Sequence, residues 1–145
     1  MNSSVEGICL DVCTNPGAGQ LLPIEEGLNH FNDLMTGISD RQPLSVLIKS
    51  SDTGEVLGGM QGRSSLGLLF IDLFYLPPEL RKRGLGTDIL FRFEEEGRKR
   101  GCTAAFLYTI SFQAPDFYTK HGWKEFGRIE CKPEGTSRIF MSKTL

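Results

Sequence analysis

The chain has 145 residues, of which 39% are hydrophobic and 23% are charged, and its formal net charge is -2. This length suits one domain with a buried core, and a charge so close to zero gives no general argument for nucleic-acid binding. No apolar run approaches the roughly 20 residues of a membrane span, and the first residues lack the basic and apolar regions of a signal peptide. We therefore expect a single cytoplasmic domain over residues 1–145, with no nucleic-acid or membrane partner.

The first forty residues are predicted to form one strand and one helix. Residues 5–12 alternate loosely between apolar and polar side chains, which predicts a strand, and Asn15-Pro16-Gly17 is typical of the turn that ends it. After this turn, apolar residues recur at spacings of three and four, as in an amphipathic helix. They are Ile24, Leu28, Phe31, Met35 and Ile38.

A β-hairpin and a long strand are predicted next. Residues 46–48 and 56–60 are expected to pair around the turn at residues 51–54. Gly58-Gly59 in the second of these strands indicates a bulge or a close backbone approach. Residues 66–76 form the longest β-like run of the chain.

The C-terminal half is predicted to alternate helices and strands. Leu85, Ile89 and Phe93 recur every four residues, and the cations at residues 98–100 followed by Gly101 are typical of a helix C-terminus. The remaining predicted elements are a buried strand at 103–110, a short helix at 114–121 and two closing strands at 123–131 and 136–142. This order predicts a mixed α/β sheet with helices on its faces.

The hexapeptide RKRGLG, residues 81–86, lies where the long strand leads into the second helix. A strand that passes through glycines into a helix presents free backbone N–H groups, and the helix dipole there favours a phosphate or pyrophosphate. Gly84 and Gly86 would let the backbone approach the phosphate oxygens, and three cations add charge. The alternative is a solvated basic helix start that binds nothing. The Walker and dinucleotide patterns are both absent.

The pattern Arg81-x-x-Gly84-x-Gly86 closely resembles the acyl-coenzyme A signature R/Q-x-x-G-x-G/A of the GNAT superfamily of N-acetyltransferases. Residues 114–123, APDFYTKHGW, are similar to the family segment A-x-x-F-Y-x-x-x-G-[FY] and lie at the expected distance. The resemblance covers residues 44–145 well and the first forty by order of elements. It implies an α/β fold with a mixed, mostly antiparallel sheet, helices on both faces, and a split between the fourth and fifth strands that holds acetyl-CoA.

The resemblance also implies which residues bind the coenzyme. The backbone N–H of Phe74 would polarise the thioester carbonyl, and Leu76 would hold the pantetheine arm through its backbone. Ser111 stands where many members carry Asn, and Phe112-Gln113 would compensate on that side. The pyrophosphate would lie on the loop, whose residues are Arg81, Lys82, Arg83, Gly84, Leu85, Gly86 and Thr87.

Two side chains are candidates for catalysis. Tyr118 matches the position of the usual family acid toward the departing sulfur, and the alternative is a core tyrosine. Asp72 is the only charged residue in the run 66–76, and strict alternation would place it on the face of Phe74. It is a candidate base or ammonium anchor, and the alternative is a structural carboxylate bonded to backbone or to a cation such as Arg63 or Arg138.

Other ionisable residues receive structural interpretations. His121 is interpreted as a helix-end residue rather than a base, and His30 as a surface residue. The run Glu94-Glu95-Glu96 is interpreted as a solvated helix face, and Trp123 as a core residue. The four cysteines, at positions 9, 13, 102 and 131, have no spacing that completes a zinc site, so we expect reduced thiols and no metal.

These observations together favour an N-acetyltransferase that takes acetyl-CoA as cosubstrate and a primary amine as acceptor, by direct attack in a ternary complex. The alternative is a catalytically silent acyl-CoA-binding sensor or partner module. The acceptor class stays open between a drug, an amino acid, a polyamine and a protein. We carry a homodimer as a further hypothesis.

Overall fold

The computed structural model describes residues 5–145. The chain divides into two compact units, and the boundary along the sequence falls between Ser39 and Asp40. The first unit contains α1 (Ala18–Thr36), which confirms the predicted helix and begins six residues earlier than its first predicted apolar residue. Its C-terminus is capped by Gly37, which has a φ of 70° and donates its N–H to the Asp33 carbonyl. Residues 5–12 form no strand, so that prediction is wrong: alternation alone is not enough without a partner strand to take up the backbone hydrogen bonds.

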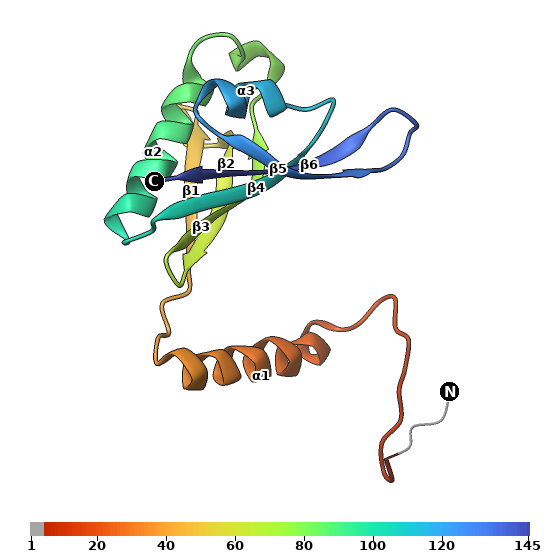
Figure 1. Ribbon diagram of the computed structural model, residues 1–145. Helices are drawn as coiled ribbons and strands as arrows, with labels where there is room; N and C mark the ends of the chain where they lie inside the picture. Colours follow the sequence, from red (N-terminus) through yellow and green to blue (C-terminus); the bar gives the residue numbers. More distant parts are fainter. Residues whose placement is uncertain (1–4) are drawn as a thin grey trace. The chain divides into compact units, whose positions relative to one another are not determined.

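The second unit is built on one six-stranded sheet with the order β1-β2-β3-β4-β6-β5 (Figure 1). All of its strand pairs are antiparallel except β3 with β4, which confirms the predicted mixed, mostly antiparallel sheet. The strands are β1 (Gln42–Lys49), β2 (Val56–Ser65), β3 (Leu68–Tyr75), β4 (Ala104–Ile110), β5 (Lys124–Glu130) and β6 (Ser137–Thr144).

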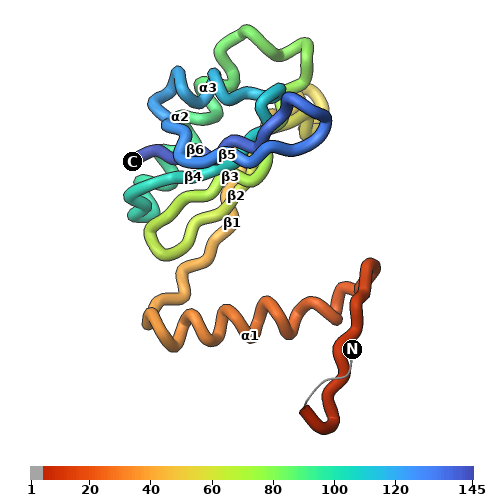
Figure 2. The backbone as a smooth tube through the Cα atoms, turned by 45° about the vertical axis from the view of Figure 1, so that its right-hand side comes forward, coloured from red at the N-terminus to blue at the C-terminus, as the bar shows by residue number. Residues whose placement is uncertain are grey.

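Three short or medium helical elements complete this unit: η1 (Pro78–Leu80), α2 (Leu85–Lys99) and α3 (Pro115–Lys120). α2 packs against β1, β2 and β3, and α3 lies beside it, as both views show (Figures 1 and 2). We call the sheet face under α2 the core face and the opposite one the outer face. Helices on both faces stay a prediction, because α2 and α3 both lie on the core face and α1 belongs to the other unit. The expectation of one domain over residues 1–145 is separate and also stays a prediction.

The core lies between α2 and the sheet, and its largest fully buried side chains include Trp123, Phe93 and Met60. Gly97 lets the helix come close, since a Cβ there would lie 2.7 Å from Leu69. The predicted helix end is also confirmed, because Gly101 follows α2 with a φ of 85°.

A tight turn separates β2 from β3. Leu66 and Gly67 have φ values of 49° and 79°, so they form a two-residue hairpin turn of the type that matches strand twist. The long run predicted at 66–76 is therefore wrong at its start, because its first two residues turn the chain and β3 begins at Leu68.

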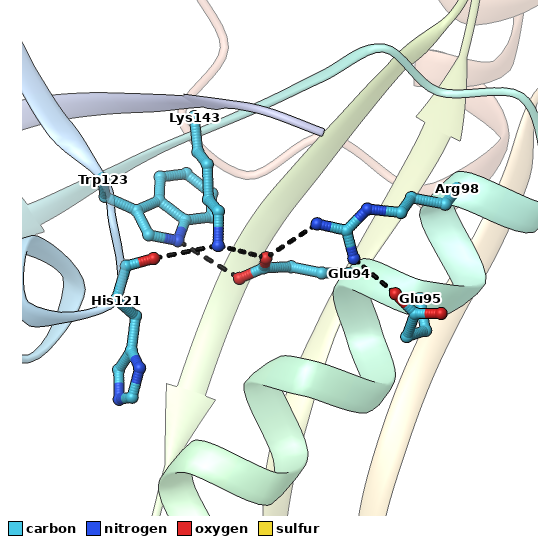
Figure 3. A network of polar contacts seen from close by, with 6 residues as sticks. All are labelled: Glu94, Glu95, Arg98, His121, Trp123 and Lys143. Carbon is cyan, nitrogen blue, oxygen red and sulfur yellow. Dashed lines mark hydrogen bonds and ion pairs between the residues drawn. The ribbon is translucent and has the colours of Figure 1, made fainter.

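A buried carboxylate ties α2 to the rest of the unit (Figure 3). Glu94 is only 4% exposed. Its Oε1 accepts a hydrogen bond from Lys143 Nζ at 2.6 Å, and its Oε2 accepts one from the Trp123 indole at 3.4 Å. Lys143 Nζ also donates to the His121 carbonyl at 2.9 Å, so the network joins α2, β6 and the connection between α3 and β5.

The interpretation of residues 94–96 as a solvated face is thus wrong for Glu94. Helical spacing explains the difference, because Glu94 lies four residues after Leu90 and three before Gly97, which are both buried. Its neighbour Glu95 is partly exposed and pairs with Arg98, as a surface charge does.

We predict that Glu94→Ala lowers the free energy of unfolding by about 3 kcal/mol, because the Lys143 ammonium and the Trp123 N–H lose their buried acceptor. Glu95→Ala is the matched control, with a side chain 42% exposed and a surface ion pair whose loss should cost below about 1 kcal/mol. Urea denaturation followed by the fluorescence of Trp123 measures both. Equal losses in the two variants would contradict a special role for Glu94.

Candidate functional site

The sheet opens between β3 and β4. The two strands pair in parallel only from Leu68 with Ala104 to Ile71 with Leu107. Beyond these residues β3 continues to pair with β2, and β4 with β6, but not with each other. The predicted split is therefore present. β3 and β4 are the fourth and fifth strands of the predicted order, which counted a first strand at residues 5–12.

The loop before α2 leaves three backbone donors free. Gly84 is the N-cap of α2 with a φ of 82°, and no side chain caps the helix. Within the described chain, none of the N–H groups of Leu85, Gly86 and Thr87 is hydrogen-bonded, as expected for a first helical turn. These N–H groups and the positive end of the helix dipole favour an anion at this point.

The three cations of this loop have different surroundings. Arg81 donates from Nε to the Leu76 carbonyl at 2.9 Å, which ties the loop to the chain just after β3. Leu76 therefore keeps its N–H, but not a free carbonyl, for the predicted contact with pantetheine. Lys82 and Arg83 are exposed and have no ion pair among residues 5–145. Their charges are available to a bound anion.

Gly86 brings the loop close to aromatic side chains at the open end of the sheet. A Cβ at this position would lie 3.3 Å from the Phe117 ring and 3.6 Å from the Phe74 ring. These two rings also contact each other, with centroids 5.8 Å apart. The first turn of α2, the end of β3 and α3 therefore meet at Gly86.

Tyr118 lies in α3 beside this meeting point. Its side chain is 4% exposed, and its ring packs edge-on against Phe117 and Trp123. No described residue is hydrogen-bonded to its hydroxyl, although every fully enclosed polar side-chain atom in the described chain has a partner. The hydroxyl therefore reaches solvent. Burial raises the pKa of the phenol above its ordinary value of 10, so the hydroxyl stays protonated at neutral pH and well above it.

His121 connects α3 to the loop. Its Nε2 lies 3.0 Å from the hydroxyl oxygen of Thr87 in the first turn of α2, and its ring packs edge-on against Phe117. The predicted loop residue Thr87 and the predicted acid Tyr118 are thus held in one packed cluster. Sequence reasoning missed the contact between Thr87 and His121, because these residues are 34 positions apart.

Asp72 is the extra residue of a β-bulge. Gln61 pairs with Leu73 and Gly62 with Ile71, so Asp72 has no partner on β2. Asp72 and Leu73 are both exposed, whereas Phe74 packs against the core. The expectation that Asp72 and Phe74 share a face is therefore wrong, because the bulge interrupts the alternation between them.

The signal for this bulge was Gly62, a glycine inside a strand that the sequence reasoning passed over. A Cβ there would fall on the carbonyl oxygen of Phe70, so the close approach at the bulge requires glycine.

The proposed structural partners of Asp72 are engaged elsewhere. Arg63 lies over the ring of Phe70 at 4.6 Å, and Arg138 lies over the ring of Tyr108 at 5.6 Å. Within the described residues no cation pairs with Asp72. Because the carboxylate is exposed, it does not have the free-energy cost of a buried charge that its place in an apolar run suggested. The group is therefore accessible to a ligand.

Ser111 and Gln113, predicted to contact pantetheine, have local hydrogen bonds. The Ser111 hydroxyl accepts a bond from the N–H of Ser137 at 2.9 Å. The Gln113 side-chain carbonyl accepts bonds from the N–H of Ile110 at 2.9 Å and from the hydroxyl of Thr109 at 3.1 Å. These bonds shape the end of β4, and the predicted coenzyme contacts of both residues stay predictions.

The described part of the chain contains no group of three or more His, Cys, Asp or Glu side chains that could hold a metal ion. The four thiols are free. None of the helices in residues 5–145 combines the length and apolar character that crossing a membrane requires.

Comparisons with known proteins agree with this geometry. A sequence model described as the acetyltransferase (GNAT) family matches residues 17–123. Acetyltransferase Atu2258 of Agrobacterium fabrum is 31% identical over 120 residues, which cover 83% of this chain and 87% of that protein. Blasticidin-S acetyltransferase of Streptomyces morookaense is 30% identical over 113 residues, which cover 76% of this chain and 83% of that protein.

The fold is also similar to solved structures. A crystal structure from Agrobacterium tumefaciens, of a protein described as an acetyltransferase, aligns with a TM-score of 0.88 at 28% identity. The alignment covers 95% of this chain and 100% of that one.

Proposed function

We propose that this chain, which belongs to the acetyltransferase (GNAT) family, moves an acetyl group from acetyl-CoA to a primary amine by direct attack. The family supplies the reaction class, an acyl transfer. The donor, the nucleophile and the residue roles are our proposal. A cytoplasmic location and a homodimer remain hypotheses on which no step depends.

One observation carries the proposal: the unbonded Tyr118 hydroxyl lies next to the cluster that joins the free N–H groups of α2 to the end of β3. An anion site alone would serve many ligands. An anion site packed against a protonated phenol at a split in the sheet supports a ligand with a phosphate at one end and a leaving group at the other. Acetyl-CoA has both.

The residues would divide the work as follows. Free N–H groups at the start of α2, with Lys82 and Arg83, would bind the pyrophosphate. The Phe74 N–H would polarise the thioester carbonyl while the amine nitrogen attacks its carbon. The carbon–sulfur bond then breaks, Tyr118 donates its proton to the sulfur, and the amine proton leaves to Asp72 or to water. The products are an N-acetyl amine and coenzyme A.

Incubation with acetyl-CoA and a panel of amines tests the function directly, with free thiol release and the mass of the acetylated product as readouts. The panel includes blasticidin S, because a relative carries that name. Binding of coenzyme A with no acetylated product from any amine would favour the silent sensor module instead.

The anion site predicts a charge effect on coenzyme binding. The double variant Lys82→Gln/Arg83→Gln should weaken coenzyme A binding about 10-fold or more, because two charge-assisted contacts with phosphate are lost. The control Arg92→Gln/Lys99→Gln removes the same charge from later positions of α2 and should bind normally. Calorimetry at two salt concentrations measures the affinity of each double variant for coenzyme A. Equal affinities of the two variants would rule out the loop as the pyrophosphate site.

Tyr118→Phe should lower turnover by about 10²-fold, the lower limit for a lost general acid, with coenzyme affinity nearly unchanged. In the parent enzyme the raised pKa of the phenol should keep turnover from falling up to pH 10, the ordinary tyrosine value. Single-turnover rates across this pH range measure both effects. A Phe variant that turns over at the parent rate would leave Tyr118 as a core residue.

Asp72→Asn should depress turnover and shift the pH profile upward, because solvent must then take the ammonium proton, whose pKa is about 10.4. Asp52→Asn, in the exposed hairpin turn between β1 and β2, is the matched control and should change neither. Acetyl-CoA affinity should be unaffected in both variants. An unshifted profile with full activity would remove Asp72 from the reaction.

A further inference from the structure

The outer face of the sheet has a hollow of about 220 Å³ over β1, β2 and β3. Side chains or backbone of six residues define most of its wall. They are Leu47, Val56, Gly59, Gln61, Leu73 and Tyr75. We call this feature the outer hollow.

Strand register explains the hollow. Gly59 of β2 pairs with Leu47 on one side and with Tyr75 on the other, so the middle of this cross-strand row has no side chain. The glycine is required, because its φ is 142° and a Cβ would lie 2.3 Å from the Val46 carbonyl oxygen. The backbone thus fixes a gap in the side-chain layer.

The hollow adjoins the candidate reaction centre. Leu73 and Tyr75 flank Phe74 on β3, the strand that borders the split. Asp72, the exposed bulge residue, has no ion pair within the described residues and immediately precedes Leu73. In the next row Arg63 lies over the ring of Phe70, 4.6 Å from its centroid. Because Leu73 and Tyr75 line the hollow, a ligand there would place its head group near Asp72 and near the N–H of Phe74.

The two faces of β3 would then bind different substrates, the coenzyme on the core face and the amine on the outer face. The free donors of α2 and the Tyr118 ring lie on the core face, where the coenzyme is proposed to bind. A nucleophile has to reach the thioester from a side that the coenzyme leaves open. The outer face provides that side.

The chemistry of the wall selects the ligand. None of its lining residues is charged, and apolar side chains, among them Leu47, Val56 and Leu73, predominate over polar ones. Burying hydrocarbon there is favourable, whereas a second ammonium group would lose hydration without a partner. The hydroxyl of Tyr75 and the amide of Gln61 add neutral polar groups.

We propose that the outer hollow binds the apolar group of the acceptor, so that the substrates are primary amines with one cationic head and an alkyl or aryl body. This inference rests on the proposed function for the transfer step. The binding of the amine itself can be tested without turnover.

The first experiment is binding without acetyl transfer. 2-Phenylethylamine is titrated into ¹⁵N- and methyl-labelled protein, with ethanolamine and 1,4-diaminobutane as probes that lack an apolar body. We expect 2-phenylethylamine to shift the signals of Leu47, Val56, Gly59 and Leu73 at tenfold lower concentration than either control. Shifts confined to other residues, or equal for the three amines, would overturn the proposal.

The second experiment uses a matched pair of variants. Leu73→Ser removes apolar surface from the hollow, whereas Leu68→Ser changes an exposed leucine on the same strand that does not line it. Leu73→Ser should raise the dissociation constant of 2-phenylethylamine about 10-fold, and its KM likewise if transfer occurs, while Leu68→Ser changes neither. Acetyl-CoA affinity should be the same in both.

The outcomes separate the two proposals. If 2-phenylethylamine binds the hollow but no amine is acetylated, the proposed function fails and the binding site stands. If ethanolamine and 2-phenylethylamine are acetylated with equal kcat/KM and Leu73→Ser leaves both values unchanged, the proposed acetyltransferase function stands. The outer hollow is then not its acceptor site.

Discussion

The site depends on the point at which β3 and β4 stop pairing. Up to Ile71 and Leu107 the parallel ladder is closed, and α2 lies close over it because Gly97 has no side chain against Leu69. Beyond that point the bulge at Asp72 turns β3, and the backbone edges of the two strands separate. Aromatic rings, rather than a ladder, then hold the open end, where Phe74 and Phe117 meet the first turn of α2. The closed half supplies rigidity, and the open half supplies unpaired backbone.

The charged side chains of α2 differ from those of the loop before it. Two arginines of α2 beyond its first turn pair with acidic neighbours, Arg92 with Asp88 and Arg98 with Glu95. Lys82 and Arg83, just before the helix, have no such partners in the described chain. A protein of net charge -2 therefore presents unpaired positive charge beside the free donors of one helix start. This local excess favours an anion at the loop, although the net charge of the whole chain is close to zero.

Local signals in the sequence predicted the helix α2, its glycine cap and the loop before it, because each depends on residues within a few positions. Two features that depend on residues far away in the sequence were missed. The face of Asp72 depends on Gln61 and Gly62 of another strand, and the burial of Glu94 depends on Lys143 at the end of the chain. The family motif located Tyr118, but only the packed structure shows that its hydroxyl has no hydrogen-bond partner among residues 5–145. The roles assigned to Phe74, Leu76, Ser111 and Gln113 remain predictions from the resemblance.

The two sides of β3 differ in what holds them. On the core side, Tyr118 packs on Trp123, Trp123 bonds to Glu94, and Thr87 contacts His121, so a change at one residue disturbs the proposed acid and the loop together. On the outer side, backbone geometry at Gly59 and at the bulge fixes the hollow, while exposed side chains such as Leu47 and Leu73 line it. Exposed residues of this kind can be exchanged at little cost in stability. On the proposed assignment, substitutions in the outer hollow would change the acceptor preference and leave the coenzyme site on the core face unchanged.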